Sequence, residues 1–275
     1  MRQVIIIAGK ELRDGMRNRW VLATTALLAA LALTLAFLGA APTGTVKGSA
    51  LAVTVVSLSS LTIFLVPLIA LLLSYDAIVG EVDRGTMALL LAYPVARWQV
   101  VLGKFVGHLA ILGFATLVGY GVAGLALQWA GNEDSGALAA FALMVASSVL
   151  LGAVFISIGY FVSALVRDRG TAAGIAIGVW LFFVLLYDMA LLGVLVADQG
   201  RTVTADVLNV LLLLNPADGY RLLNLTATPD VSGFAGVAGL GGHTGLGPPA
   251  LLGALAAWVV APLAAAVALF ARRQV

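Results

Sequence analysis

Six long apolar runs constrain the fold of this chain more than any other feature of its sequence. About 20 helical residues cross the roughly 30 Å hydrocarbon layer of a bilayer. Backbone groups have no water partner in lipid, and the two-residue alternation of a barrel strand is absent, so only helices can span. We therefore predict an all-α membrane protein with six transmembrane helices, at Trp20–Ala41, Ala50–Tyr75, Gly107–Trp129, Ala137–Leu165, Thr171–Leu195 and Ala250–Ala271.

The composition excludes several other classes of protein. Hydrophobic residues make up 62% of the chain and charged residues 10%, whereas soluble domains contain about 25% charged residues. No basic stripe of the kind that binds nucleic acid is present. The chain contains no cysteine, which excludes thiolate metal sites, disulfides and cysteine catalysis. The charged N-terminal segment lacks a cleavage site and is not expected to be a signal peptide.

Basic residues are distributed unevenly among the segments that connect the runs. Of the 15 lysines and arginines, Lys47, Arg201 and Arg221 lie in the segments after the first and fifth runs, which leaves 12 for the alternate segments. Those segments precede the first run, join the second to the third and the fourth to the fifth, and follow the sixth. Because cytoplasmic loops carry the excess of Lys and Arg, we predict that both termini are cytoplasmic.

The runs divide the chain into four parts. Residues 1–19 place apolar and charged positions on opposite faces, which predicts an amphipathic helix at the cytoplasmic membrane surface. Residues 20–195 hold five predicted spans and a cytoplasmic loop at about 76–99. Residues 196–249 contain an apolar helix too short to span, followed by a glycine-rich loop. Residues 250–275 hold the sixth span and a cytoplasmic tail.

Short motifs on the predicted cytoplasmic side resemble those of a known family. The N-terminal helix contains Lys10-Glu11-Leu12-Arg13-Asp14, and the loop contains Glu81 and Arg84-Gly85-Thr86, followed by Gly103-Lys104. These motifs resemble the ABC-2 type transporter permeases. Within that family, four segments are similar to the permeases of nitrous oxide reductase maturation transporters, namely residues 13–20, 75–81, 103–108 and 215–222.

The resemblance implies a type V exporter-like fold with an N-terminal elbow helix, in a bacterial inner membrane. It implies a homodimer of this subunit, two copies of a separate cytoplasmic ATPase and a periplasmic copper-chaperone-like (NosD-like) subunit, acting in copper-site (CuZ and CuA) maturation during denitrification. The loop between the second and third spans would be a coupling helix seated in the ATPase. The residues that carry this role by resemblance are Glu81, Asp83, Arg84, Gly85, Thr86 and Met87, with Arg167, Asp168 and Arg169 as a second contact.

The chain is not expected to be an enzyme. It has no G-x-x-x-x-G-K phosphate loop, so ATP and its magnesium ion would bind to the partner ATPase and no cofactor would bind directly to this chain. Copper would require clustered sulfur or imidazole ligands, and His108 and His243 are better explained as a packing residue and a solvated loop residue. We therefore predict no catalytic residue and no metal ligand in this chain.

Two further groups of residues are candidate sites. Gly170, Gly174 and Gly178 lie on one face of the fifth predicted span, at a spacing that suits a helix–helix seam or a subunit interface. The second group is a set of predicted periplasmic partner or gate residues, and it consists of Asp188, Asn215, Pro216, Tyr220 and Arg221.

Alternative functions remain open at this point. A generic ABC-2 exporter of a lipid, peptide or drug would share the same spans and the same cytoplasmic loop. An ion-coupled carrier is disfavoured because the sequence shows neither repeated halves nor ionisable residues at the membrane midplane. An intramembrane enzyme is disfavoured because no H-E-x-x-H or G-x-S-x-G motif occurs.

Overall fold

The computed structural model describes residues 2–17, 19–38, 50–129, 135–198, 203–226 and 246–273, which are helical apart from short connections and contain no strand. The predicted glycine-rich loop therefore lies almost entirely outside the described residues, as does His243. The elements are α1 (Arg2–Met16), α2 (Arg19–Leu38), α3 (Ala50–Ser74), α4 (Val79–Asp83), α5 (Thr86–Leu91), α6 (Arg97–Trp129), α7 (Ser135–Leu165), α8 (Arg169–Leu181), the π-helical segment η1 (Phe182–Leu186), α9 (Tyr187–Asp198), α10 (Ala205–Leu214), α11 (Pro216–Thr226) and α13 (Pro248–Arg272).

Several of these helices are long and apolar enough to cross a membrane. Five stretches meet the requirement alone, and α1 and α2 meet it only as a pair that is bent by 69°. The five stretches are Thr54–Asp83, Arg97–Ala126, Leu138–Leu165, Arg169–Asp198 and Pro248–Arg272. All of them overlap spans predicted from the sequence, and α2 occupies the first predicted span.

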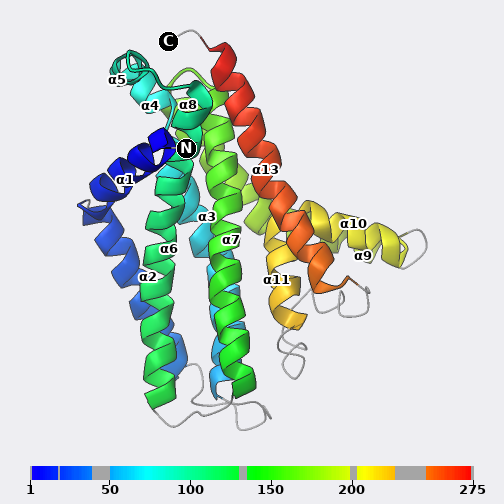
Figure 1. Ribbon diagram of the computed structural model, residues 1–275. Coiled ribbons are helices and arrows are strands. Elements are labelled where there is room, and N and C mark those ends of the chain that lie inside the picture. Colours follow the sequence, from blue (N-terminus) through cyan, green and yellow to red (C-terminus); the bar gives the residue numbers. More distant parts are fainter. Residues whose placement is uncertain are drawn as a thin grey trace.

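Helix α7 is the centre of the bundle (Figure 1). It packs against α3, α6 and α13, and α6 in turn packs against α1 and α2. In its most apolar stretch, 72% of the residues are buried, whereas the corresponding stretches of α8–α9 and of α13 are 11% and 17% buried. These two stretches therefore face the surroundings of the chain, which in a membrane are lipid or another protein.

Two elements differ from the predicted boundaries. Helix α6 begins at Arg97 and not at Gly107. Val100 and Val101 are buried, so the packing surface of this helix extends to residues before Gly107. The fifth span is not one uniform α-helix, since η1 interrupts it between α8 and α9.

The segment after the fifth span forms two short helices. The predicted apolar helix is α10, which begins after Thr204, whose hydroxyl accepts a hydrogen bond from the Val207 N–H. Helix α11 was not predicted, although its start has a recognisable signal. The Asn215 side chain accepts a hydrogen bond from the Ala217 N–H, and Pro216 occupies the first helical position. In Figure 1, α9 and α10 project sideways from the bundle, while α11 returns along it.

Candidate functional site

A short helical hairpin, α4–α5, lies at one end of the bundle (Figure 1). Gly85 joins the two helices with φ 70°, a left-handed conformation that favours glycine. The start of α4 is fixed to the end of α7, because the backbone N–H groups of Ile78 and Val79 both donate to the Ser163 hydroxyl at 3.0 Å. The hairpin is therefore attached to the central helix and is not a free loop.

Beneath the hairpin lies the Lys104 cluster, which consists of Lys104, Glu11 and Glu81. The Lys104 side chain, on α6, is 3% exposed. Its ammonium group contacts Glu11 Oε1 on α1 at 2.8 Å and Glu81 Oε1 on α4 at 2.7 Å. The second oxygen of Glu81 is buried and has no hydrogen-bond partner among the described residues. One buried cation thus connects the N-terminal helix, the hairpin and a long helix of the bundle.

Two glycines allow α1 to approach α6 closely. A β-carbon at Gly103 would lie 2.7 Å from Ile7 Cβ, and one at Gly107 would lie 2.6 Å from Glu11 Cβ. This four-residue spacing of small residues seats the N-terminal helix beside Lys104. By contrast, a β-carbon at Gly174 or Gly178 would meet nothing within 4 Å. The predicted glycine face on α8 therefore forms no seam within the described part of one chain, and its role at a subunit interface stays a prediction.

The predicted second contact, residues 167–169, is linked to the segment before the hairpin. Arg169 donates to both carboxylate oxygens of Asp76, at 2.7 and 2.8 Å, and Arg84 approaches the same carboxylate at 3.5 Å. Asp168 caps α8 by accepting the Thr171 N–H at 2.8 Å. Asp76 was not among the predicted site residues, although its position two residues before Ile78 places it at the turn into the hairpin.

The predicted coupling residues differ in their exposure. Asp83, Arg84, Gly85 and Thr86 are exposed, as are Arg167, Asp168 and Arg169. Glu81 and Met87 instead face inward, Glu81 because Lys104 attracts its carboxylate and Met87 because it is fully buried in the core. Leu89, which lies two residues beyond Met87, is 70% exposed and presents an apolar side chain on the outer side of the hairpin.

The C-terminal end of α13 lies at the same end of the bundle. Arg97, at the start of α6, donates to the carbonyls of Phe270 and Ala271 at 2.8 and 3.2 Å. Arg273 donates to the Ser163 and Ala164 carbonyls at the end of α7. The structure therefore brings together the four basic segments that charge distribution assigns to one side of the membrane. That this side is cytoplasmic stays a prediction.

A second polar cluster, the Arg221 cluster, lies where α9, α10 and α11 meet. It consists of Asp188, Asn215, Asp218 and Arg221. Arg221 Nη1 donates to Asp188 Oδ2 and to Asp218 Oδ1, both at 2.9 Å. Asn215 Nδ2 lies 2.9 Å from Asp218 Oδ2, 3.4 Å from Asp188 Oδ1 and 3.1 Å from the Phe183 carbonyl of η1. Sequence reasoning grouped three of these residues but missed Asp218, which is only 1% exposed.

The other predicted partner or gate residues are internal. Tyr220 is fully buried, and its hydroxyl lies 3.1 Å from that of Ser148 on α7. Asn215 and Pro216 are buried as well. These three side chains cannot form the surface that an outer partner touches in this structure. Tyr220 joins α11 to α7, and Asn215 joins the start of α11 to η1 and α9, so their contribution to a gate would be structural.

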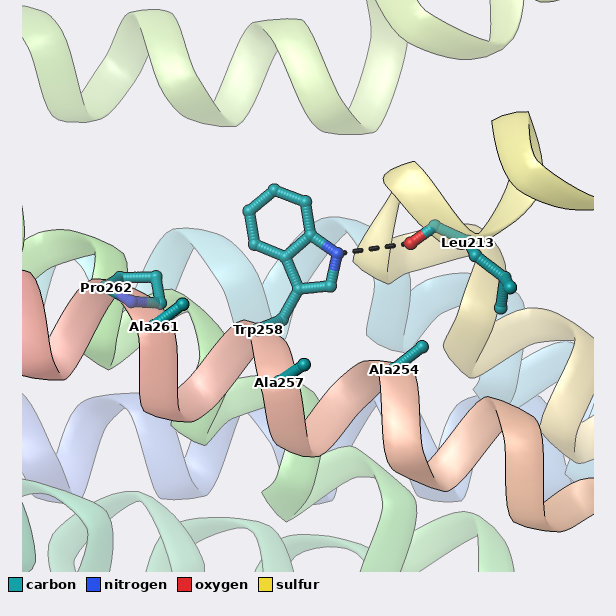
Figure 2. A pocket seen from close by; sticks show the side chains of 6 residues that line it. All are labelled: Leu213, Ala254, Ala257, Trp258, Ala261 and Pro262. Carbon is teal, nitrogen blue, oxygen red and sulfur yellow. Dashed lines mark hydrogen bonds between the residues drawn. The ribbon is translucent and has the colours of Figure 1, made fainter.

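An apolar hollow lies beside α13 (Figure 2). Its volume is ≈ 320 Å³, and it is lined by Leu213, Ala254, Ala257, Trp258, Ala261 and Pro262. The Trp258 indole N–H donates to the Leu213 carbonyl at 3.2 Å, and none of the described residues that line the space is charged. No group of three metal-ligating side chains occurs among the described residues. His108 packs against Tyr160, with 2.9 Å between Nδ1 and the hydroxyl oxygen, and its Nε2 lies 3.7 Å from Glu11 Oε2.

Known proteins resemble this chain over its whole length. Residues 5–275 match the family described as ABC-2 family transporter protein. A protein of Pseudomonas aeruginosa named "Probable ABC transporter permease protein NosY" is 49% identical over 277 residues, with 100% of both chains covered. A protein of Stutzerimonas stutzeri with the same name is 47% identical over 275 residues, with 99% of both chains covered. The chain therefore belongs to the ABC-2 family of ABC transporter permeases.

Proposed function

We propose that this chain couples a separate cytoplasmic ATP-binding-cassette ATPase to a periplasmic partner during copper-site maturation of nitrous oxide reductase. Two copies of the chain would pair in the bacterial inner membrane, with two ATPase subunits and a NosD-like outer subunit. The two relatives named NosY support this assignment because their similarity extends over the full chain. ATP and magnesium would bind to the ATPase, since this sequence has no phosphate loop.

The anchored α4–α5 hairpin carries the proposal. Its outer side exposes charged residues and Leu89, an apolar side chain that would be covered in a complex. Its inner side contacts Lys104 on α6 and Ser163 on α7. A push on the hairpin by nucleotide-driven closure of the ATPase would therefore reach two long helices and, through Glu11, the N-terminal helix.

Substitution of Leu89 tests the predicted docking surface. In the variant Leu89→Asp we expect the ATPase to be lost from the solubilised complex, because a carboxylate would replace the apolar contact. Intact-complex mass spectrometry measures the loss and also reports the stoichiometry and the outer subunit. Trp129→Gln is the control, because Trp129 is 97% exposed at the other end of α6. Equal ATPase content in both variants would contradict docking at this hairpin.

The proposed role in copper-site maturation requires a test of its own. Deletion of the gene should yield nitrous oxide reductase that lacks its copper centres, as measured by metal content and by optical and paramagnetic spectra. Reductase with full copper content in the deletion strain would contradict the maturation role and leave the ATPase coupling standing. That outcome would favour a generic exporter of a lipid, peptide or drug. The apolar hollow beside Trp258 is the observation that favours this alternative, since it suits an apolar cargo.

A further inference from the structure

The Arg221 cluster contains more acidic than basic groups. Each of the four carboxylate oxygens of Asp188 and Asp218 has Arg221 or Asn215 as a partner. The guanidinium carries one positive charge and the amide carries none, so two ionised carboxylates would leave a net charge of −1. The Asp218 side chain is 2% exposed and that of Asp188 22% exposed, so water stabilises this excess charge poorly.

The groups packed around the cluster do not neutralise it. Helix α11 contacts α3, α7, α10, α13 and η1. From α7, Ser147 and Ser148 bond to the neutral side chains of Asn224 and Tyr220. From α9, the Tyr187 hydroxyl donates to the Leu211 carbonyl of α10. Within the described part of the chain, the ion pairs of both aspartates are with Arg221.

We propose that Asp188 and Asp218 together bind one proton, which makes the Arg221 cluster a proton-binding site. Two neighbouring carboxylates that share one cation disfavour double ionisation, and burial acts in the same direction. One bound proton brings the charge of the cluster to zero. In agreement with this geometry, burial and the adjacent Asp188 carboxylate raise the pKa of Asp218 to about 7. This inference does not depend on the proposed function.

The proton would control a hinge, because the cluster joins two breaks in helical structure. Asn215 has an extended backbone between α10 and α11, and its amide also bonds to the Phe183 carbonyl in the π-helical segment. Loss of the proton would leave one negative charge in excess at this junction. We expect the contacts that hold α10 against α9 and α11 to loosen as water enters to solvate that charge.

Infrared spectroscopy of the full chain in lipid nanodiscs tests for the proton directly. The difference between wild type and Asp218→Asn should show the carbonyl stretch of one protonated carboxyl group at about pH 6, and this band should disappear by about pH 8.5. Asp188→Asn should also remove the band, because the remaining carboxylate can then pair with Arg221 in its ionised form. Asp206→Asn is the control, because Asp206 is exposed in the first turn of α10.

Two outcomes of the infrared titration would overturn the proposal. One is a wild-type chain without a protonated carboxyl band at about pH 6, and the other is a band that persists in both aspartate variants. The use of two variants protects the test against a single substitution that prevents folding. The infrared spectra of the wild type and of the variants depend on neither an ATPase nor an outer partner. Failure of the proton-binding proposal is therefore distinct from failure of the proposed function.

A spin label on α10 tests the hinge. The chain has no cysteine, so Val207→Cys, at a position 45% exposed, gives one label per chain. In wild type the mobility of the label should increase between about pH 6 and about pH 8.5. With Asp218→Asn it should stay low over the same range, because the asparagine amide replaces the protonated carboxyl. A mobility independent of pH in the wild type would contradict control of the hinge by the proton.

Discussion

The two polar clusters share an arrangement of charges but differ in their electrostatics. Each places one cation between two carboxylates from different helices, Lys104 with Glu11 and Glu81, and Arg221 with Asp188 and Asp218. Burial alone would raise the pKa of Glu11, but the ammonium of Lys104 lowers it overall. Burial and Asp188 instead raise the pKa of Asp218, despite Arg221.

The difference shows that the cation by itself does not determine the ionisation of its partners. Glu11 is 12% exposed and lies near a second cation, Lys10, at 3.4 Å. Asp218 is more deeply buried and shares its cation with a carboxylate beside it. Opposite charges stabilise an ionised carboxylate, whereas a like charge and desolvation favour the protonated form. We therefore expect the Lys104 cluster to behave as a permanent ionic connection and the Arg221 cluster as a titratable one.

Removal of Lys104 should have the largest effect. The substitution Lys104→Met leaves two carboxylates with little access to water. Removal of one partner of a buried ion pair lowers the free energy of unfolding by about 3–5 kcal/mol. Thermal unfolding of the solubilised chain measures the loss. Lys10→Met is the matched control, because Lys10 is 60% exposed and its ion pairs are worth at most about 1 kcal/mol. Similar losses in both variants would show that Lys104 is not a structural connection.

Removal of Arg221 should cost less, because its cluster can respond by binding protons. We expect Arg221→Leu to destabilise the chain by about 2–3 kcal/mol, close to the penalty for an unsatisfied buried charged group. Combination with Asp218→Asn should recover part of the loss, and a double-mutant cycle measures this coupling. Arg84→Leu is the control, since Arg84 is 49% exposed and its ion pair is 3.5 Å long. Additive losses would contradict a shared charge between Arg221 and Asp218.

The seating of α1 can be tested separately from the charge of Lys104. Gly107→Ala places a methyl group 2.6 Å from Glu11 Cβ and 3.1 Å from the Ala8 carbonyl, and such overpacking costs about 1–3 kcal/mol. Gly121→Ala, also on α6, meets nothing within 4 Å and should be neutral or stabilising by up to about 1 kcal/mol. Thermal unfolding of both variants measures the difference. Equal stabilities would contradict close packing between α1 and α6.

The dependence of stability on pH tests the same comparison through a slope and not through the loss of a single contact. The folded chain, in which the pKa of Asp218 is about 7, binds a proton that the unfolded chain releases above about pH 4. Stability should therefore fall as pH rises from about 4 to about 7 and become constant above that range. Asp218→Asn should remove this slope in the unfolding midpoint, and Asp206→Asn should retain it. A wild-type midpoint that rises with pH over this range would contradict the assignment.

Much of the fold follows from local sequence features. A run of apolar residues must lie in lipid wherever it occurs in the chain, so the positions of the spans could be predicted without knowledge of their neighbours. The start of α10 could be predicted because a capping threonine acts within one turn. The start of α11 was not predicted, although Asn215-Pro216 carries a local signal for the start of a helix.

The candidate sites were predicted less completely. The sequence predicted one coupling helix in the loop at about 76–99, where the structure has the two short helices α4 and α5. The orientations of Glu81 and Met87 depend on Lys104 and on a core assembled from several helices. Asp76 and Asp218 were missed because their partners, Arg169 and Asp188, lie far away in the sequence. An exposed acidic residue and a buried one look the same in a single sequence when their partners are unknown.

The sequence by itself determined that the chain is a polytopic helical membrane protein, where its long apolar helices lie and which segments are basic. These properties depend on the transfer of residues between water and lipid, which acts on each segment independently. Only the tertiary structure decided that one lysine joins α1, α4 and α6, and that two aspartates share one arginine at a break between helices. Those arrangements arise from contacts between distant segments, and in such contacts burial and neighbouring charges determine whether a side chain is ionised.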